Sequence, residues 1–255
     1  MSIRRRGVGL TDGDTVEDEM GKFLTAQWRN LVMANWEVDP ALLAPYVPKG
    51  TSLDLFEGKA FVSLVAFQFL DTQVLGVPIP WHRNFEEVNL RFYVVREVNG
   101  ELRRGVVFIS EYVPRFWIAL VARTVYNERY SSVPMRHQVT TSTAGVDGEY
   151  AWRVGGKWHN VRFSSKNQPQ PLVLGSREKF IAEHYWGYTV QRNGGTMEYK
   201  VEHESWQVWT QAEVVVELDG HTCYGAQFGE ALSKPATFSF VAQGSPVVVN
   251  KGSKL

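Results

Sequence analysis

The segment from Phe85 to Val95 alternates between polar and apolar side chains. Read as a β-strand, it places Glu87, Asn89, Arg91 and Tyr93 on one face, because successive strand side chains point to opposite sides. Valine, leucine and phenylalanine occupy the positions between them, and this apolar face predicts contact with a core. The polar face must then meet either water or a polar cavity. A glutamate, an amide, a guanidinium and a phenol in one row favour the wall of a binding cavity.

Runs of strand length recur along the rest of the chain, separated by turn residues. The predicted strands are Gln27–Val38, Ser52–Phe56, Ala60–Asp71, Phe85–Glu97, Leu102–Val113, Arg136–Thr143, Tyr150–Val154, Lys157–Ser164, Thr196–His203, Ala212–Leu218, Ala236–Ala242 and Pro246–Asn250. Hairpin turns are expected at Glu57-Gly58-Lys59, Asn99-Gly100, Asp147-Gly148 and Gly155-Gly156. Of these, Asn-Gly is the strongest hairpin signal.

Helical spacing is limited to three short stretches. Asp39 and Pro40 provide an N-cap and a first helical residue for a helix that ends before Gly50. Apolar positions recur every three to four residues between Pro114 and Tyr130. Ser176 can cap a third helix, residues 177–186, whose inward residues would be Phe180, Ile181, His184 and Tyr185.

These patterns predict a mainly β fold with a few short helices, arranged as an antiparallel barrel or strongly curved sheet. An open sandwich is the alternative. Residues 1–22 are polar and contain a basic and an acidic patch, which predicts a disordered tail. No repeat or linker follows, so residues 23–255 are interpreted as one domain.

Composition narrows the classes of function. The net charge of zero lacks the excess of basic residues typical of nucleic-acid-binding proteins. The chain has 9 Trp, 10 Tyr and 14 Phe, residues that favour strands and apolar ligand pockets. A single cysteine, no membrane-spanning run and no secretory signal predict a cytoplasmic protein. The C-terminal Ser253-Lys254-Leu255 would be a peroxisomal signal if the source is a eukaryote.

Common catalytic signatures are missing from the sequence. There is no nucleophile elbow, phosphate-binding loop, dinucleotide-binding glycine pattern or zinc-protease motif. The histidines show no metal-ligand spacing beyond His221-x-Cys223, so neither a metal nor a cofactor is predicted. Lysines lie mainly in turns or polar stretches, where nothing lowers the pKa of an amine. That distribution argues against a Schiff-base mechanism.

Several ordered segments resemble the DUF2071 (YqjF-like) family. They are Leu31–Pro40, Asp54–Leu64, Glu86–Arg91 and Glu202–Trp206, and the resemblance extends over roughly residues 23–250. It implies the fold of acetoacetate decarboxylase, a cone-like, closed, antiparallel β-barrel with an internal cavity. It also implies that Glu87 occupies the position of an active-site glutamate on an interior strand.

The chain departs from the decarboxylase pattern where that enzyme carries its Schiff-base lysine. The most similar stretch here is Ala122–Ser131. It keeps an arginine as Arg123, but the lysine position is Tyr130. A second arginine of the decarboxylase, just before its Asp-Pro helix start, corresponds to Glu37. A tyrosine can donate a hydrogen bond or act as an acid, but it cannot form an imine.

The predicted catalytic residues are Glu87 and Tyr130, and the predicted substrate-binding residues are Asn89, Arg91 and Arg123. Each has a simpler structural interpretation. The polar row could be the solvated face of an edge strand, Arg91 could form a structural ion pair with Glu87, and Arg123 could lie at the surface. His184 and His203 are interpreted as structural histidines.

The leading hypothesis is a small-molecule-binding barrel whose ligand is anionic or contains a carbonyl. Whether the chain is an enzyme acting on a carbonyl or carboxylate compound stays open. The first alternative is a non-catalytic ligand-binding or sensor protein. The second is a protein-interaction module, since the proline-broken apolar stretch Val74–Trp81 suits either a lid or an interface, including one between copies of this chain. Nucleic-acid and membrane partners are not expected.

Overall fold

The computed structural model describes residues 21–78, 83–114 and 130–255. Its strands are β1 (Lys22–Val38), β2 (Ser52–Leu53), β3 (Ala60–Val74), β4 (Val77–Pro78), β5 (Phe85–Val98), β6 (Glu101–Val113), β7 (Tyr130–Ser132), β8 (Met135–Ser142), β9 (Gly145–Val154), β10 (Lys157–Ser165), β11 (Gln170–Pro171), β12 (Trp186–Val190), β13 (Thr196–His203), β14 (Gln207–Trp209), β15 (Glu213–Glu217), β16 (Phe238–Ala242), β17 (Pro246–Asn250) and β18 (Ser253–Lys254). Its helices are α1 (Pro40–Leu43), the 3₁₀ turn η1 (Ala44–Tyr46), α3 (Arg177–Ala182) and α4 (Gly220–Leu232).

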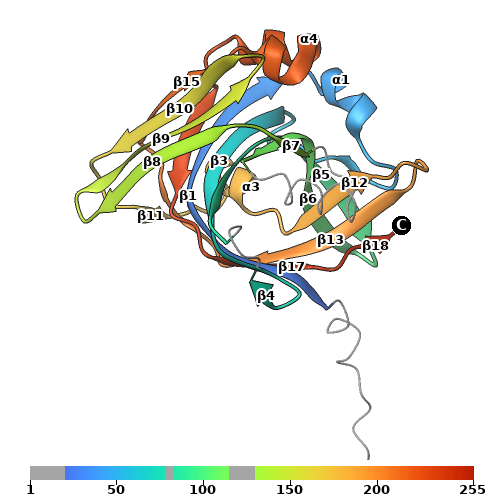
Figure 1. The fold of residues 1–255 in the computed structure, drawn as a ribbon. Helices are drawn as coiled ribbons and strands as arrows, with labels where there is room; N and C mark the ends of the chain where they lie inside the picture. The colour runs from blue at the N-terminus through green and yellow to red at the C-terminus, as the bar shows by residue number, and fades with distance from the viewer. Residues whose placement is uncertain (1–20, 79–82, 115–129) are drawn as a thin grey trace, which may run out of the picture.

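The large sheet closes on itself. Strands follow one another in the order β1, β17, β13, β12, β6, β5 and β3, and β3 pairs again with β1, so the hydrogen bonds run round a complete ring. Figure 1 shows the strands of this ring curving round α3. Ring closure confirms the expectation of a closed, mainly β fold.

One joint of the ring differs from the prediction. β12 pairs with β6 in parallel, and β7 also lies parallel to β6, so the sheet is not wholly antiparallel. At the β12–β6 joint, a Cβ on Gly105 would lie 2.7 Å from the carbonyl oxygen of Trp186 and 2.6 Å from the ring of Tyr188. The two strands can therefore approach this closely because residue 105 is a glycine.

A second, four-stranded sheet in the order β15-β10-β9-β8 lies against the outside of the ring (Figure 1). The two sheets enclose an apolar core between them, to which β5 contributes Val88, Leu90, Phe92 and Val94. Trp152 of β9 lies in the same core and is fully buried. The apolar face of β5 thus has a partner, and its polar face points into the ring.

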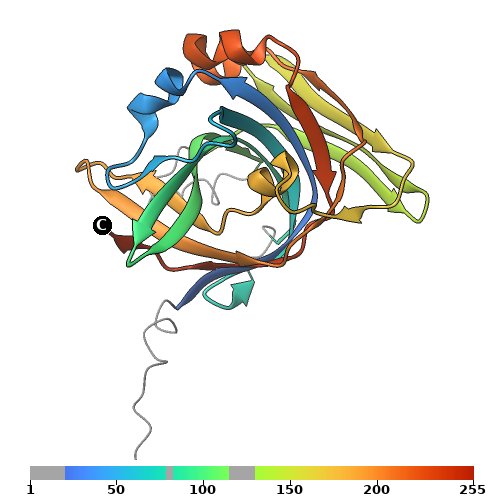
Figure 2. The same ribbon diagram turned by 180° about the vertical axis from the view of Figure 1, so that it is seen from behind.

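The interior of the ring is filled on one side by α3, which both ribbon views show within the ring opening (Figures 1 and 2). Phe180, Ile181 and Ala182 of this helix join the interior core. Ser176 caps it as predicted, because its Oγ accepts a hydrogen bond of 3.1 Å from the amide of Lys179. The Asp39 cap of α1 is confirmed too, with Oδ1 2.8 Å from the amide of Ala41.

Three predicted elements are corrected by the structure, and one helix was missed. The turn at Glu57-Gly58 forms, but β2 pairs with β5 instead of with β3, so Ser52–Phe56 and Ala60–Asp71 make no hairpin. Asp147-Gly148 lies inside β9, and the preceding turn is at residues 143–144. The helix starting at Arg177 ends at Ala182, since Trp186–Val190 pairs as β12. The sequence reading also missed α4, where Gly225 breaks the helical geometry with a φ of 80°.

The Asn99-Gly100 hairpin between β5 and β6 is confirmed, and so is the Gly155-Gly156 turn between β9 and β10. β1 already begins at Lys22, the last residue of the predicted tail. The helix predicted between Pro114 and Tyr130 lies, except for its two end residues, outside the described residues. Ser253 and Lys254 pair with β13 as β18.

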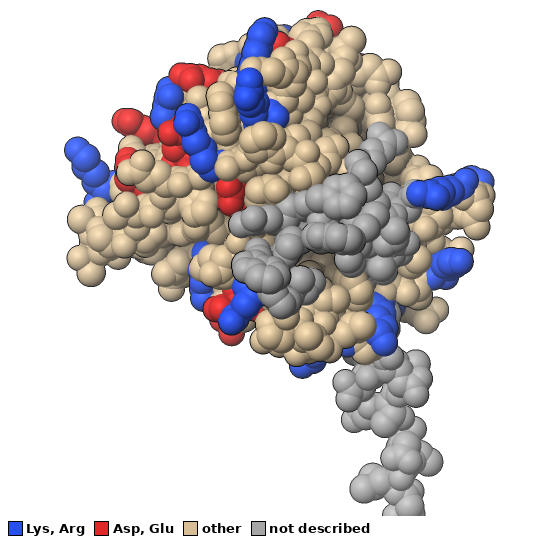
Figure 3. Space-filling model, in the orientation of Figure 1, with Lys and Arg blue, Asp and Glu red and all other residues tan. Residues whose placement is uncertain are grey.

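The molecular surface carries charges of both signs. On the face in Figure 3, Lys and Arg side chains of the described residues lie among Asp and Glu at the left, whereas the charged side chains visible at the right are Lys and Arg. Within the described part of the chain, the helices are all too short or too polar to cross a bilayer.

Candidate functional site

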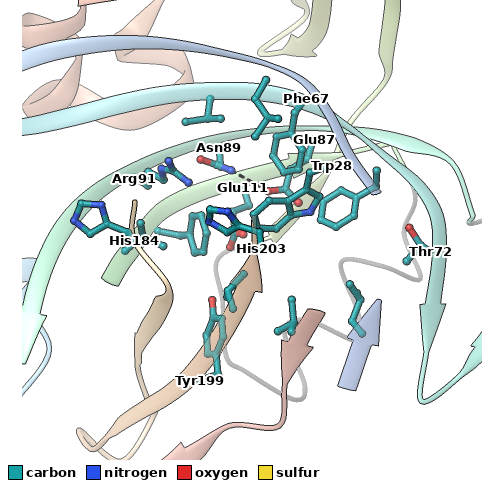
Figure 4. A pocket seen from close by; sticks show the side chains of 18 of the residues that line it. Trp28, Phe67, Thr72, Glu87, Asn89, Arg91, Glu111, His184, Tyr199 and His203 are labelled. Carbon is teal, nitrogen blue, oxygen red and sulfur yellow. Dashed lines mark hydrogen bonds between the residues drawn. The ribbon is translucent and has the colours of Figure 1, made fainter. Parts of the chain in front are cut away.

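The polar row of β5 lines a cavity inside the ring. Glu87, Asn89 and Arg91 all face it, and their exposed fractions are 2%, 1% and 8%. Figure 4 shows the three side chains projecting from one strand toward the same space. The alternative that the row is the solvated face of an edge strand is therefore excluded by the burial of Glu87, Asn89 and Arg91.

The cavity has a volume of about 130 Å³, counted as the space open to the centre of a water molecule. One water needs roughly 10–15 Å³ on that measure, so the cavity has room for a small organic molecule. Its wall is mostly apolar and aromatic. Trp28 contacts Phe67 and Phe69 edge-on at 5.4 and 5.9 Å between ring centroids, and Trp206 stacks on His203 at 4.4 Å.

Glu87 is the ionisable group most affected by this setting. Burial disfavours its charged form and raises the pKa of the carboxyl to about 7, although hydrogen bonds from Asn89 and Tyr130 and the charge of Arg91 act in the opposite direction. A carboxyl group with this pKa can hold a proton or release it near neutral pH. General acid–base catalysis requires that property.

Two hydrogen bonds fix the orientation of Glu87. Asn89 Nδ2 donates to Oε1 at 2.9 Å, and the hydroxyl of Tyr130 donates to Oε2 at 3.1 Å. Tyr130 begins β7, which lies parallel to the end of β6 and brings the phenol to the cavity wall. The two residues predicted to be catalytic are therefore in direct contact.

Arg91 is the single Lys or Arg side chain among the described lining residues. Its Nη2 lies 3.5 Å from the carbonyl oxygen of Ile181, and its Nε is buried without a hydrogen-bond partner among the described residues. The guanidinium carbon lies 5.7 Å from the ring centroid of Tyr93. Arg91 thus presents an unused donor inside an apolar cavity.

Glu111 of β6 also lines the cavity, with an exposed fraction of 1%, and the sequence reading missed it. The reason is a β-bulge. Arg91 pairs with Phe108, but Leu90 pairs with Ser110, so one extra residue is inserted in β6. The insertion reverses the alternation beyond it. Val106 and Phe108 face the cavity from even positions, and Glu111 faces it from an odd one.

Two histidines contribute to the cavity wall as well, although the sequence favoured structural roles for both. His184 follows α3, and His203 lies at the end of β13. For His184 the sequence carried a usable signal, since the helical spacing from Phe180 predicted that it points inward. For His203 no pattern in the sequence indicated the cavity.

The remaining predicted residues lie elsewhere. Arg123 falls in 115–129, outside the described residues, so its role stays a prediction. Glu37 is exposed and pairs with Lys59 at 2.8 Å, so it contributes nothing to the cavity. In the apolar stretch Val74–Trp81, Leu75 and Val77 are 59% and 63% exposed, and its last three residues are outside the described part.

No lysine is among the described residues that line the cavity. The three stretches outside the described range contain no lysine in their sequence either. The described residues also contain no group of three or more His, Cys, Asp or Glu side chains placed to hold a metal ion. Among the residues of this cavity, Glu87 can still act as an acid or a base.

Solved structures with a similar fold include several enzymes. The protein MppR of enduracididine biosynthesis, complexed with pyruvate, gives a TM-score of 0.61 at 15% identity, covering 95% of this chain and 93% of that one. Acetoacetate decarboxylase from Legionella pneumophila gives 0.60 at 13% identity, covering 91% and 87%. An acetoacetate decarboxylase-like enzyme from Sphingomonas wittichii RW1 gives 0.61 at 13% identity, covering 97% and 99%. At these identities the likeness establishes the fold alone.

Sequence comparison gives a closer relationship. The protein YqjF of Bacillus subtilis (strain 168) is 26% identical over 204 residues, which cover 76% of this chain and 79% of YqjF. The profile of DUF2071, described as an uncharacterized conserved protein, matches residues 25–246. The chain therefore belongs to the DUF2071 family, with the fold of the acetoacetate decarboxylase-like proteins.

Proposed function

We propose that this protein binds a small carboxylate or carbonyl compound inside the ring, and that Glu87 exchanges a proton with the bound molecule without an imine intermediate. The observation that carries the proposal is the combination of a buried carboxyl, whose pKa is raised to about 7, with a buried arginine that has an unused donor in the same cavity.

Each residue has a distinct role in this proposal. Arg91 binds the anionic oxygen of the ligand, because a charge-assisted hydrogen bond in an apolar cavity is stronger than one in water. Glu87 accepts or donates the proton. Asn89 holds the Glu87 carboxyl in place, and Tyr130 positions the reacting oxygen. Arg123 stays a second predicted anion-binding residue.

The absence of lysine from the described wall directs the proposal away from decarboxylation through a Schiff base. Deprotonation next to a carbonyl needs only a base with a suitable pKa and a donor for the developing oxyanion. The fold neighbour MppR is complexed with pyruvate in one structure and with a condensation product of pyruvate in another. Those complexes support pyruvate as the first probe for this cavity.

A calorimetric titration of pyruvate into the protein tests the binding proposal. We expect binding by the wild type and a loss of about tenfold or more in affinity for Arg91→Gln, since a hydrogen bond to a charged group contributes about 1.5–3 kcal/mol. Arg136→Gln is the matched control, because Arg136 is exposed on β8 in the outer sheet. No binding by the wild type, or equal affinity for Arg91→Gln, contradicts the proposal.

The non-catalytic alternative uses the same residues for affinity only, and the largely apolar wall is compatible with it. Exchange of the methyl protons of pyruvate in D₂O separates the two. A catalytic Glu87 removes a proton from the methyl carbon, and the resulting enolate then takes a deuteron from solvent. We expect the wild type to accelerate exchange and Glu87→Gln to abolish the acceleration. Binding without accelerated exchange favours the non-catalytic function.

A further inference from the structure

His184 has a position that packing alone does not require. It follows α3 inside the ring, and its side chain is 1% exposed. The imidazole lies against Tyr93, with 4.6 Å between ring centroids, and edge-on to Phe180 at 5.3 Å. Figure 4 shows it beside Arg91, at the end of the polar row away from Glu87.

Asp54 determines which nitrogen of His184 carries the proton. The Nε2 atom is 3.1 Å from Asp54 Oδ2, and the same oxygen accepts a 2.6 Å hydrogen bond from Nε of Arg104. Burial alone would raise the pKa of Asp54, but the hydrogen bonds from His184 and Arg104 lower it, so the group is an anion that can only accept. The proton must then be on Nε2.

The other nitrogen, Nδ1, is consequently an acceptor on a residue that lines the cavity. Burial lowers the pKa of His184 to about 4, against the effect of its bond to Asp54, so the ring is neutral at physiological pH. Its Nδ1 atom is buried and has no hydrogen-bond partner among the described residues. A neutral histidine still donates to Asp54 through Nε2–H, so no ion pair is needed.

The polar row of β5 contains a second buried acceptor without a hydrogen-bond partner. Asn89 Oδ1 is buried without a partner among the described residues, while its Nδ2 is used by Glu87. Together with the unused Nε donor of Arg91, the part of the wall formed by β5 and His184 offers one cationic donor and two neutral acceptors. Trp28 Nε1 and Thr72 Oγ1, elsewhere in the wall, also lack partners among the described residues. Buried polar groups are normally hydrogen-bonded. The complementary molecule has an anionic acceptor for Arg91 and a donor for an adjacent acceptor.

We infer that His184, positioned by Asp54, is a specificity-determining residue that selects a small carboxylate carrying a hydroxyl group, a 2-hydroxy acid, over the corresponding 2-oxo acid. The carboxylate binds Arg91, and the neighbouring hydroxyl donates its hydrogen to His184 Nδ1. The inference rests on the proposed function, because it assumes that Arg91 binds the carboxylate.

The alternatives fit the same wall less well. A keto oxygen can only accept, so in the place of the hydroxyl it would face the lone pair of Nδ1. An ammonium group is a donor, but it would bring a further positive charge near Arg91 and Arg104. Their charges disfavour a cation at His184, against the opposite effect of Asp54. A hydroxyl group can donate a hydrogen bond and adds no positive charge, so it meets both requirements.

Calorimetric titrations with lactate and pyruvate test the inference on the full chain. These two probes differ only in the group next to the carboxylate. We expect the wild type to bind lactate about tenfold more tightly than pyruvate, as one additional buried hydrogen bond allows. His184→Phe keeps a ring against Tyr93 but removes the acceptor, so the preference for lactate should disappear while pyruvate still binds. His221→Phe, at an exposed position of α4, is the control.

The outcomes separate the two claims. If the wild type binds pyruvate at least as tightly as lactate, or if His184→Phe keeps the wild-type preference, the inference is overturned and the proposed function stands. If the wild type binds neither probe, both fail. If His184→Phe does not fold, nitrogen NMR of the wild type replaces it: lactate should shift the resonance of His184 Nδ1 and pyruvate should not. Equal shifts with both probes, or a proton on Nδ1 in the free protein, overturn the inference.

Discussion

Glu87 combines two properties that oppose each other in the folded protein. It is held by hydrogen bonds from Asn89 and Tyr130, which favour its anion, and it is buried in an apolar cavity, which disfavours that anion more strongly. The balance leaves a pKa of about 7, compared with 4.5 for the free side chain. An uncharged side chain here would avoid the cost of burying a charge.

The raised pKa makes the stability depend on pH. Between pH 4.5 and about 7 the folded state binds more protons at Glu87 than the unfolded state does, so the free energy of unfolding falls as the pH rises through this window. Glu87→Gln has no titrating carboxyl, so we expect it to lack this pH dependence. The stability of the variant relative to the wild type should therefore increase by up to about 3 kcal/mol from below pH 4.5 to above pH 7.

Urea unfolding of both proteins across this pH range is the measurement. His184 acts with the opposite sign, because its lowered pKa makes stability rise with pH between about 4 and 6.5, but it is common to both proteins and cancels in the difference. Glu97→Gln, exposed at the far end of the same strand, is the control. A difference between the wild type and Glu87→Gln that is independent of pH would contradict a buried titrating carboxyl.

At the scale of elements, the position of each site residue depends on strand bulges and strand pairing. The alternation of polar and apolar residues in the sequence reveals these only in part. The inward row of β5 was predictable because the bulge opposite Leu90 and Arg91 inserts its extra residue in β6, so the alternation along β5 itself continues from Glu87 to Tyr93. Glu111 was not, because the bulge before it reverses the strand faces and carries no glycine or proline to mark it. Long-range pairing such as β2 with β5 likewise leaves no local signal.

Helix ends show the same limitation. The Ser176 cap fixed the start of α3, but its end at Ala182 is set by tertiary structure, since Trp186 and Gly187 pair with β6 to close the ring. Helical spacing continues past the point where the chain becomes a strand. Helix propensity is a local quantity and does not reveal where the helix ends, because the competing hydrogen bonds come from a strand some 80 residues earlier (Gly105 to Trp186).

The parallel joint between β6 and β12 leads to a prediction about Gly105. An added Cβ would lie 2.7 Å from a backbone oxygen of the partner strand, which cannot move without shifting β12. We expect Gly105→Ala to lower the free energy of unfolding by about 1–3 kcal/mol, as overpacking typically does. Chemical denaturation measures the effect. Gly21→Ala is the control, since its Cβ would meet only the flexible side chain of Lys251, at 3.5 Å. Equal stability of the two variants would show that the joint is not tightly packed.

At the scale of the whole molecule, the wall shared by β1, β3 and β5 separates two cores. One core lies between this wall and the outer sheet, and the other lies inside the ring around the cavity. This division was not predictable from the sequence, because strand patterns indicated a closed barrel or a sandwich as alternatives. The structure has a closed ring with a second sheet packed on its outside.

Two cores on opposite sides of one strand predict that stability and ligand binding can be altered separately. Leu90 is fully buried in the outer core, so Leu90→Ala should lower the free energy of unfolding by about 2–5 kcal/mol. It should leave the affinity for pyruvate unchanged in native conditions, because its side chain points away from the cavity. Leu102→Ala, at a position 64% exposed, should change neither quantity. A large loss of affinity in Leu90→Ala would contradict the separation of the two faces.

The central claim is that Glu87 titrates inside a cavity that receives an anion at Arg91. The most direct test is the affinity of pyruvate for the wild type and for Glu87→Gln at about pH 6 and pH 8. Pyruvate is an anion at both values, so the ionised form of Glu87 should repel it. We expect wild-type affinity to fall by up to about tenfold over this interval, while the affinity of Glu87→Gln stays constant. Wild-type affinity that does not change with pH would contradict the account.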